Sequence, residues 1–258
     1  MTLRLAALLA LVPAAAAADP VRLPDDPVAA LDRAVARWEA SCRAPTADGA
    51  CTRTRTVALK KDRCARETHA IDLVRSTKAA RAARAALTVA LTAVEQQPDA
   101  ARPALAAVAA RGRSALAEAA YEDFLRLRFP TGLDFSGARG ARSQKRFAAF
   151  LDQATKALDA ATEAYRRVSE HAGATHELRL RALARTGQLN ADFAEMLLGS
   201  EIPRNVRTGE LAADKIDAYC GAMAENVEPV EDRARALFEE CSALAAGQPP
   251  WAAVCGAP

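Results

Sequence analysis

Six cysteines and three histidines are the side chains of this sequence whose chemistry could define a site. No two cysteines form the C-x2-C pair of a zinc site. Cys64 and His69 are five residues apart, unlike the C-x-x-C-H of haem attachment. An even number of cysteines without metal-ligand spacing is typical of disulfides in an oxidising compartment. We therefore expect three disulfides, and neither a metal nor a cofactor.

The positions of the cysteines restrict how they pair. Three lie before the segment 130–142 and three lie after it, so at least one bridge must join the two halves. On one helix, Cys51 and Cys64 would be roughly 20 Å apart, too far for a disulfide. In the last helical hairpin, Cys220 would not face Cys241, which can instead meet the returning tail. The expected bridges are Cys42–Cys51, Cys64–Cys220 and Cys241–Cys255.

The histidines do not lie in a catalytic pattern. They are His69, His171 and His176. A metalloprotease helix needs two histidines four residues apart with a glutamate between them, and His176-Glu177 is not followed by a second histidine. The G-x-S-x-G turn, a phosphate-binding glycine loop and an EF-hand loop are also missing. The sequence therefore predicts a protein that is not an enzyme, although a site assembled from residues far apart in the chain stays open as a third hypothesis.

Charge is distributed unevenly along the chain. Residues 53–84 contain ten bases and three acids, whereas residues 208–240 contain three bases and nine acids. The ten bases are Arg53, Arg55, Lys60, Lys61, Arg63, Arg66, Arg75, Lys78, Arg81 and Arg84. One interpretation is a basic helix that binds an anionic envelope polymer or lipid head groups; nucleic acid is the weakest option, because this stretch has no aromatic side chain for base stacking. The other, which we favour, is a solvated helix facing the protein's own acidic C-terminal part.

The first 18 residues have the layout of a secretory signal peptide. Arg4 is followed by the apolar run Leu5–Val12 and by an alanine run that ends at Ala18. The small side chains predict cleavage between Ala18 and Asp19. The apolar run is far below the roughly 20 residues of a membrane-spanning helix, and no cysteine near the cut supports a lipid anchor. We expect a periplasmic or extracellular protein that is not a lipoprotein and has no transmembrane segment after cleavage.

Most of the mature chain has helical periodicity. Alanine, the strongest helix former, supplies 66 of the 258 residues. The clearest stripe is Phe147, Leu151, Ala154, Leu158, Ala161, Tyr165 and Val168. Residues 52–97 contain neither proline nor glycine and predict one helix roughly 70 Å long, or one that breaks near residues 52–60. The expected helices span about 26–42, 52–97, 99–128, 143–172, 175–198, 209–226 and 229–246, with a turn near Val227 and a short closing turn at 251–255.

These elements predict an all-α protein, at least about 65% helical and without a β-sheet. The fold is expected to be an elongated bundle or tetratricopeptide-repeat-like array of about six long helices plus a short C-terminal helix. An N-terminal helical part at 19–129 and a C-terminal helical part at 143–258 are separated by a linker at 130–142. The two parts are expected to pack together as one unit.

Residues 114–258 also contain short sequence motifs that are found in a known class of proteins. They are Ala120-Tyr121, Tyr165-Arg166-Arg167-Val168, Leu183 to Leu189 followed by Phe193-Ala194, Ile202-Pro203, Asp217-Ala218-Tyr219, Glu228-Pro229, Ala234, Cys241, and Trp251 with Cys255. This half of the chain resembles the C-terminal helical region of bacterial exported tetratricopeptide-repeat (TPR) proteins of the cell envelope. The resemblance implies a helical scaffold for protein–protein interaction.

Two functions follow as expectations. The first is a non-enzymatic periplasmic scaffold or adaptor that binds a protein partner without a cofactor. The alternative is a binding module for an anionic envelope ligand, acting through the basic helix 53–84. The sequence carries no signal of an oligomeric state.

Overall fold

The computed structural model describes residues 26–46, 51–99, 102–246 and 251–256, and 68% of these residues are helical. The helices are α1 (Pro27–Ala40), α2 (Thr77–Glu95), α3 (Pro103–Leu125), α4 (Gly140–Ser169), α5 (His176–Leu198), α6 (Ala212–Leu244) and α7 (Trp251–Cys255). A short 3₁₀ turn, η1 (Gly137–Arg139), and two strands, β1 (Thr52–Ala58) and β2 (Glu67–Leu73), complete the described elements. The expected predominantly α-helical bundle is confirmed. The expected leader at residues 1–18 lies outside the described residues.

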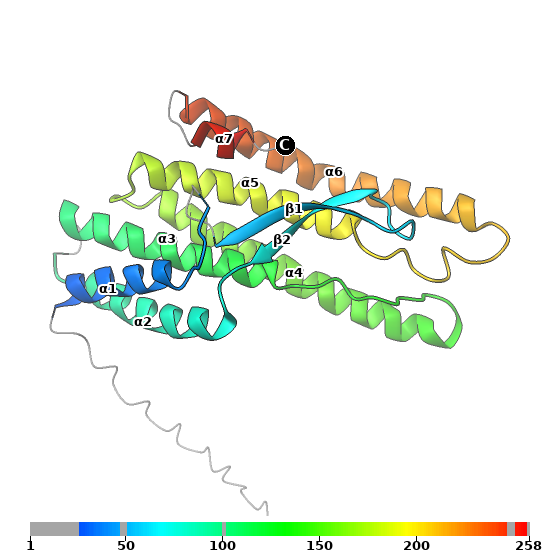
Figure 1. The fold of residues 1–258 in the computed structure, drawn as a ribbon, viewed down its shortest axis with the longest axis horizontal. Helices are drawn as coiled ribbons and strands as arrows, with labels where there is room; N and C mark the ends of the chain where they lie inside the picture. The colour runs from blue at the N-terminus through cyan, green and yellow to red at the C-terminus, as the bar shows by residue number, and fades with distance from the viewer. Residues whose placement is uncertain (1–25, 47–50, 100–101, 247–250, 257–258) are drawn as a thin grey trace, which may run out of the picture.

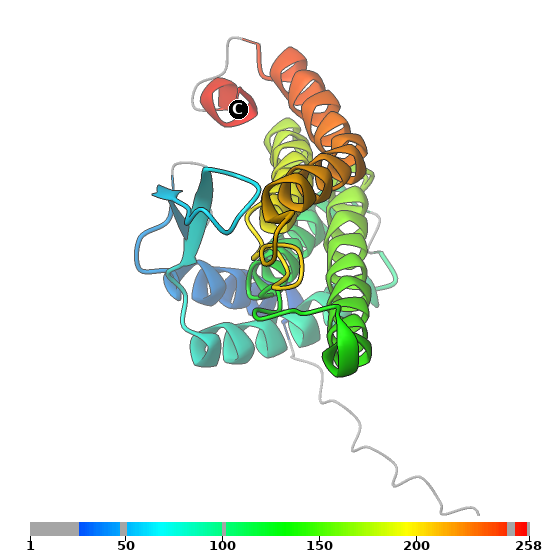
Figure 2. The same cartoon turned by 90° about the vertical axis from the view of Figure 1, so that its right-hand side faces the viewer.

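The long helices α3 to α6 run side by side along the length of the molecule (Figure 1). Viewed along these helices, α3 and α5 lie centrally, with the β1–β2 hairpin on one side and α4 on the other (Figure 2). Helices α1 and α2 pack on each other and on α3, while α7 folds back onto α5 and α6. None of the described helices is both long and apolar enough to cross a membrane.

Side-chain caps and apolar stripes account for the main helices. Asp26 accepts a hydrogen bond from the Ala29 backbone N–H at 3.0 Å and Pro27 occupies the first turn, which starts α1 where the sequence predicts it. Thr175 caps α5 in the same way. In α4 the predicted stripe is buried from Ala154 to Val168 and packs against α3 and α5.

Residues 52–74 form a β-hairpin, so the predictions of one long helix at 52–97 and of no β-sheet were wrong. Strand β1 alternates threonine and arginine, and its β-branched threonines favour an extended chain over a helix. The strands pair antiparallel, with Thr54 opposite Ile71. Ile71 and Leu73 pack on the helical core. The helical part of the predicted segment begins only at Thr77, where Ser76 caps α2.

Two other boundaries differ from the predictions. The expected turn near Val227 is absent, because α6 continues through Pro229. Proline has no backbone N–H, so the helix lacks one hydrogen bond at Pro229. Pro229 is exposed while Val227 and Val230 are buried, so the apolar residues before and after the proline still lie on the same face of α6. The linker is the non-helical stretch 126–136 followed by η1, and α4 begins at Gly140, inside the predicted 130–142 segment.

The structure pairs all six cysteines, and the pairs are those expected. Cys42–Cys51 joins the end of α1 to the start of the hairpin, with Cα atoms 5.5 Å apart. Cys64–Cys220 joins the β1–β2 loop to α6, and Cys241–Cys255 joins α6 to α7, each at 5.3 Å. The local structure assumed for this pairing was nevertheless wrong. Cys51 precedes β1 and Cys64 lies in the β1–β2 loop instead of both lying on one helix, and Cys220 and Cys241 lie on one continuous helix instead of on a hairpin of two.

The bridge that joins the two halves should contribute most to stability. The sequence separation is 156 for Cys64–Cys220 but 14 for Cys241–Cys255, and cross-linking a longer loop restricts the unfolded chain more. We expect Cys64→Ala/Cys220→Ala to lower the free energy of unfolding by about 4–5 kcal/mol and Cys241→Ala/Cys255→Ala by about 3 kcal/mol. Denaturant unfolding measures both, and an equal or reversed order would contradict the assignment.

Candidate functional site

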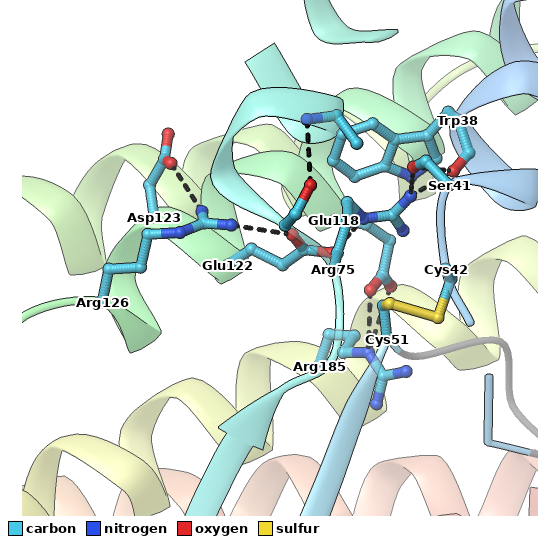
Figure 3. Close-up of polar contacts among 12 residues, drawn as sticks. Trp38, Ser41, Cys42, Cys51, Arg75, Glu118, Glu122, Asp123, Arg126 and Arg185 are labelled. Carbon is cyan, nitrogen blue, oxygen red and sulfur yellow. Dashed lines mark hydrogen bonds and ion pairs between the residues drawn. A yellow bond between two sulfur atoms is a disulfide. The ribbon is translucent and has the colours of Figure 1, made fainter. Parts of the chain in front are cut away.

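Two buried ion pairs lie one turn apart on α3 (Figure 3). Glu122 accepts a hydrogen bond from Arg75 Nε at 2.9 Å, and Glu118 accepts one from Arg185 Nε of α5 at 3.1 Å. All four side chains are at least nine-tenths buried. Burial raises the pKa of Glu122 even though Arg75 and Arg126 oppose the shift. Buried charges are costly to desolvate, so these pairs specify how the elements dock more than they add net stability.

Arg75 connects more elements than any other basic residue predicted for anion binding. Its guanidinium lies 3.7 Å from the centre of the Trp38 ring and donates hydrogen bonds to the Trp38 carbonyl and to Ser41 Oγ at the end of α1 (Figure 3). Since its Nε holds Glu122 of α3, it joins α1, α3 and the junction between β2 and α2. The expectation that Arg75 binds an external anion is therefore wrong, because the side chain is 3% exposed and already paired.

The structure divides the ten predicted basic residues among several elements, so the basic helix 53–84 does not exist. Arg53 and Arg55 lie on β1, Lys60 to Arg66 on the loop, and Lys78, Arg81 and Arg84 on α2. Four of the ten pair with acids of this chain: Arg55 with Asp72, Arg63 with Asp62, Arg75 with Glu122 and Arg84 with Asp123. Within the described residues, none of the ten forms an ion pair with the acidic segment 208–240.

A cavity of about 260 Å³ lies beneath the hairpin, and we call it the hairpin cavity; its lining is largely apolar but includes several charged side chains. It is lined by Thr46, Thr52, Thr54, His69, Ile71, Tyr121, Arg185, Gln188, Ala191, Asp192, Glu195, Phe238 and Val254. These residues come from both strands and from α3, α5, α6 and α7. The cavity exists because the short hairpin packs on the helices through Ile71 and Leu73 and holds its threonine-rich edge above α5.

Hydrogen bonds organise the floor and rim of the hairpin cavity. Tyr121 Oη donates to Asp192 at 2.9 Å, and burial raises the pKa of Asp192 to about 7. His69 Nδ1 lies 2.6 Å from Glu195, which also accepts the His69 backbone N–H and the Thr68 hydroxyl. The hydrogen bond to Glu195 raises the pKa of His69. We did not predict Tyr121, Asp192 or Glu195; the D-x-x-E spacing on α5 places both acids on one helix face.

The three predicted non-catalytic histidines lie apart from one another. His69 meets Glu195, His171 Nδ1 accepts the Gly173 backbone N–H, and His176 lies 3.2 Å from the Leu244 carbonyl. Every cysteine is in a disulfide, so His69 has no thiol beside it to activate. Among the residues described, no set of three His, Cys, Asp or Glu side chains could hold a metal ion.

An apolar groove of about 430 Å³ lies between α4 and α6 at the other end of the bundle, and we call it the α4–α6 groove. It is lined by Leu133, Phe135, Phe147, Leu151, Leu197, Tyr219, Ala222, Met223 and Asn226. The N-terminal parts of α4 and α6 project past the end of α5 (Figure 1), so the apolar stripes of both helices continue beyond the helix that covers them elsewhere. Phe135 is 37% exposed and stacks edge-on to Phe147 at 6.1 Å.

Removing Arg75 should be far more damaging than removing an exposed arginine. Arg75→Ala removes the buried partner of Glu122 and leaves its carboxylate with only the less buried Arg126, so the free energy of unfolding should fall by about 3 kcal/mol. The matched control is Arg55→Ala, whose ion pair with Asp72 is more than half exposed and should cost less than about 1 kcal/mol. Chemical denaturation compares the two, and similar losses would contradict the central role of Arg75.

The histidines should titrate on opposite sides of their ordinary pKa. His69 should titrate above 6.5 and His171 below it, because Glu195 favours imidazolium at His69 while burial and Arg113 disfavour it at His171. The His69–Glu195 pair should therefore make its full contribution to the free energy of unfolding below about pH 6.5. That contribution is lost as the pH rises through the raised pKa of His69. NMR titration measures both rings. Glu195→Gln should lower the pKa of His69 and leave that of His171 unchanged; an unchanged pKa of His69 would refute the pairing.

Comparisons of this chain with family models, with curated proteins and with solved structures find no match.

Proposed function

We propose that this protein is an exported, non-enzymatic helical adaptor that binds a protein partner at the cell envelope. The observation that carries the proposal is the α4–α6 groove, whose lining is apolar except for Asn226 and the Tyr219 hydroxyl. Contiguous apolar surface of this kind is typical of interaction sites. The leader-like N-terminus and the three disulfides support an oxidising, extracytoplasmic compartment. The TPR likeness supports a scaffold role.

The shape of the groove favours an amphipathic helix as its occupant. Two helices flank it and Leu197 of α5 forms part of its floor, so an added helix would extend the bundle by one member. Helices bind such grooves through apolar side chains spaced three and four residues apart. We therefore expect a partner segment with such a stripe, lying between α4 and α6 and covering Phe135.

The occupant comes from a different protein. Between residues 26 and 256, the undescribed stretches are at most four residues long, too short for a two-turn helix. The start of α1 lies at the opposite end of the molecule from the groove (Figure 1). A second copy is also a poor fit, because a two-fold dimer needs a self-complementary surface and two concave grooves cannot fill each other.

A photo-crosslinking amino acid placed in the groove tests the proposal. Introduced at Phe135 and expressed in the native host, it should give one adduct with a distinct envelope protein, because this side chain borders the bound helix. Met223→Asp places a carboxylate on the groove wall and should reduce the adduct at least about tenfold, since an unpaired charge is costly in an apolar interface. The matched control, Ala224→Asp on the exposed side of α6, should leave the adduct unchanged.

Reconstitution with the purified partner then gives the affinity and stoichiometry of the complex for each variant. Circular dichroism melting checks that both variants fold. Adducts only with a second copy of this chain would refute a distinct partner, and equal loss in both variants would refute binding through the groove.

A further inference from the structure

Asp192 in the hairpin cavity is a carboxylate without a cationic partner. Its hydrogen-bond donor is the Tyr121 hydroxyl, and within the described part of the chain no Lys, Arg or His side chain lies within ion-pair distance of it. The other charged groups in the cavity are matched, Glu195 by His69 and Arg185 by Glu118. When it is ionised, Asp192 therefore gives the cavity a negative charge that no described cationic side chain contacts directly.

The walls around Asp192 suit a small molecule with an apolar body. Ile71 of β2, Ala191 of α5 and Phe238 of α6 line the space, while Thr52 and Thr54 add hydroxyl groups. Gly187 helps to form this wall, because a Cβ there would meet the Phe238 ring at 3.0 Å and push it away from α5. A volume of about 260 Å³ leaves room for a ligand of a few heavy atoms and excludes a folded segment.

We propose that the hairpin cavity binds a small organic cation, a primary amine with a short apolar chain, whose ammonium group contacts the Asp192 carboxylate. The chain of the amine lies against Ala191, Ile71 and Phe238. The hydroxyls of Thr52 and Thr54 accept the remaining ammonium hydrogens. The site is separate from the α4–α6 groove, since the two share no lining residue.

The electrostatics determine how binding depends on pH. The groups that act on Asp192 are Tyr121 of α3, Arg185 and Glu195 of α5, and His69 of β2. Between pH 6 and pH 8 Asp192, with its pKa of about 7, becomes ionised. Ionisation of Asp192 favours a bound cation, and a simple amine remains protonated over this range. The ionised fraction of Asp192 rises about tenfold, so the affinity should rise by at least about that factor.

Calorimetric titration of the full chain with n-butylammonium tests the proposal, with butan-1-ol as the neutral probe of the same shape. The amine should bind and the alcohol should bind at least tenfold more weakly. Asp192→Asn keeps an acceptor for Tyr121 but removes the charge, and should lower the affinity for the amine at least about tenfold and abolish its pH dependence. Asp159→Asn, at an exposed carboxylate on α4, is the matched control and should bind like the unaltered chain.

A second variant tests the space instead of the charge. Ala191→Leu should fill the cavity and prevent amine binding at every pH, while the melting temperature shows that the variant folds. Equal binding of the amine and the alcohol, unchanged binding by Asp192→Asn, or no heat from the amine at millimolar concentration would each overturn the proposal.

Discussion

The packing of the N-terminal half depends on one buried guanidinium. Arg75 touches the Trp38 ring, the end of α1 and Glu122 of α3, and it lies at the point where the chain leaves β2 to enter α2. A buried arginine is stable only where every neighbouring donor and acceptor is correctly placed. Its position therefore specifies one docking of α1, the hairpin and α2 against α3, which apolar contacts alone would leave less defined.

The β1–β2 hairpin also depends on the buried Arg75 side chain for its stability. A two-stranded sheet is marginally stable in water and needs packing or covalent support. Here Cys42–Cys51 secures its start, Cys64–Cys220 secures its loop, and Arg75 secures its end. Glu195 adds the fourth attachment by accepting hydrogen bonds from Thr68 and His69. Held in this way, the hairpin covers α5 without collapsing onto it, and the space that remains is the hairpin cavity.

The two candidate binding surfaces differ in the side chains that line them because they lie in different parts of the packing. The hairpin cavity lies between the hairpin and the helices, and its polar lining residues come from β1, β2, α3, α5 and the loop before β1. The α4–α6 groove lies at an uncovered end of the bundle, where the apolar stripes of α4 and α6 extend beyond the end of α5, the helix that covers them elsewhere. The difference that separates them is charge: the hairpin cavity contains acidic and basic side chains, whereas the groove is lined by none.

The sequence by itself determined the helical class, the starts of α1 and α5, and the core stripe of α4, because caps and 3.6-residue periodicity are local signals. The odd number of cysteines in each half also required a bridge between halves if all six pair within the chain, and Cys64–Cys220 is that bridge. Residues 52–74 were misassigned because the absence of proline and glycine permits a helix without requiring one. Their threonine–arginine alternation becomes a strand when disulfides and the helical core supply a surface for Ile71 and Leu73. Only tertiary structure could bury Arg75 against Glu122 or bring His69 to Glu195, since these partners are 47 and 126 residues apart and no local pattern records such distances.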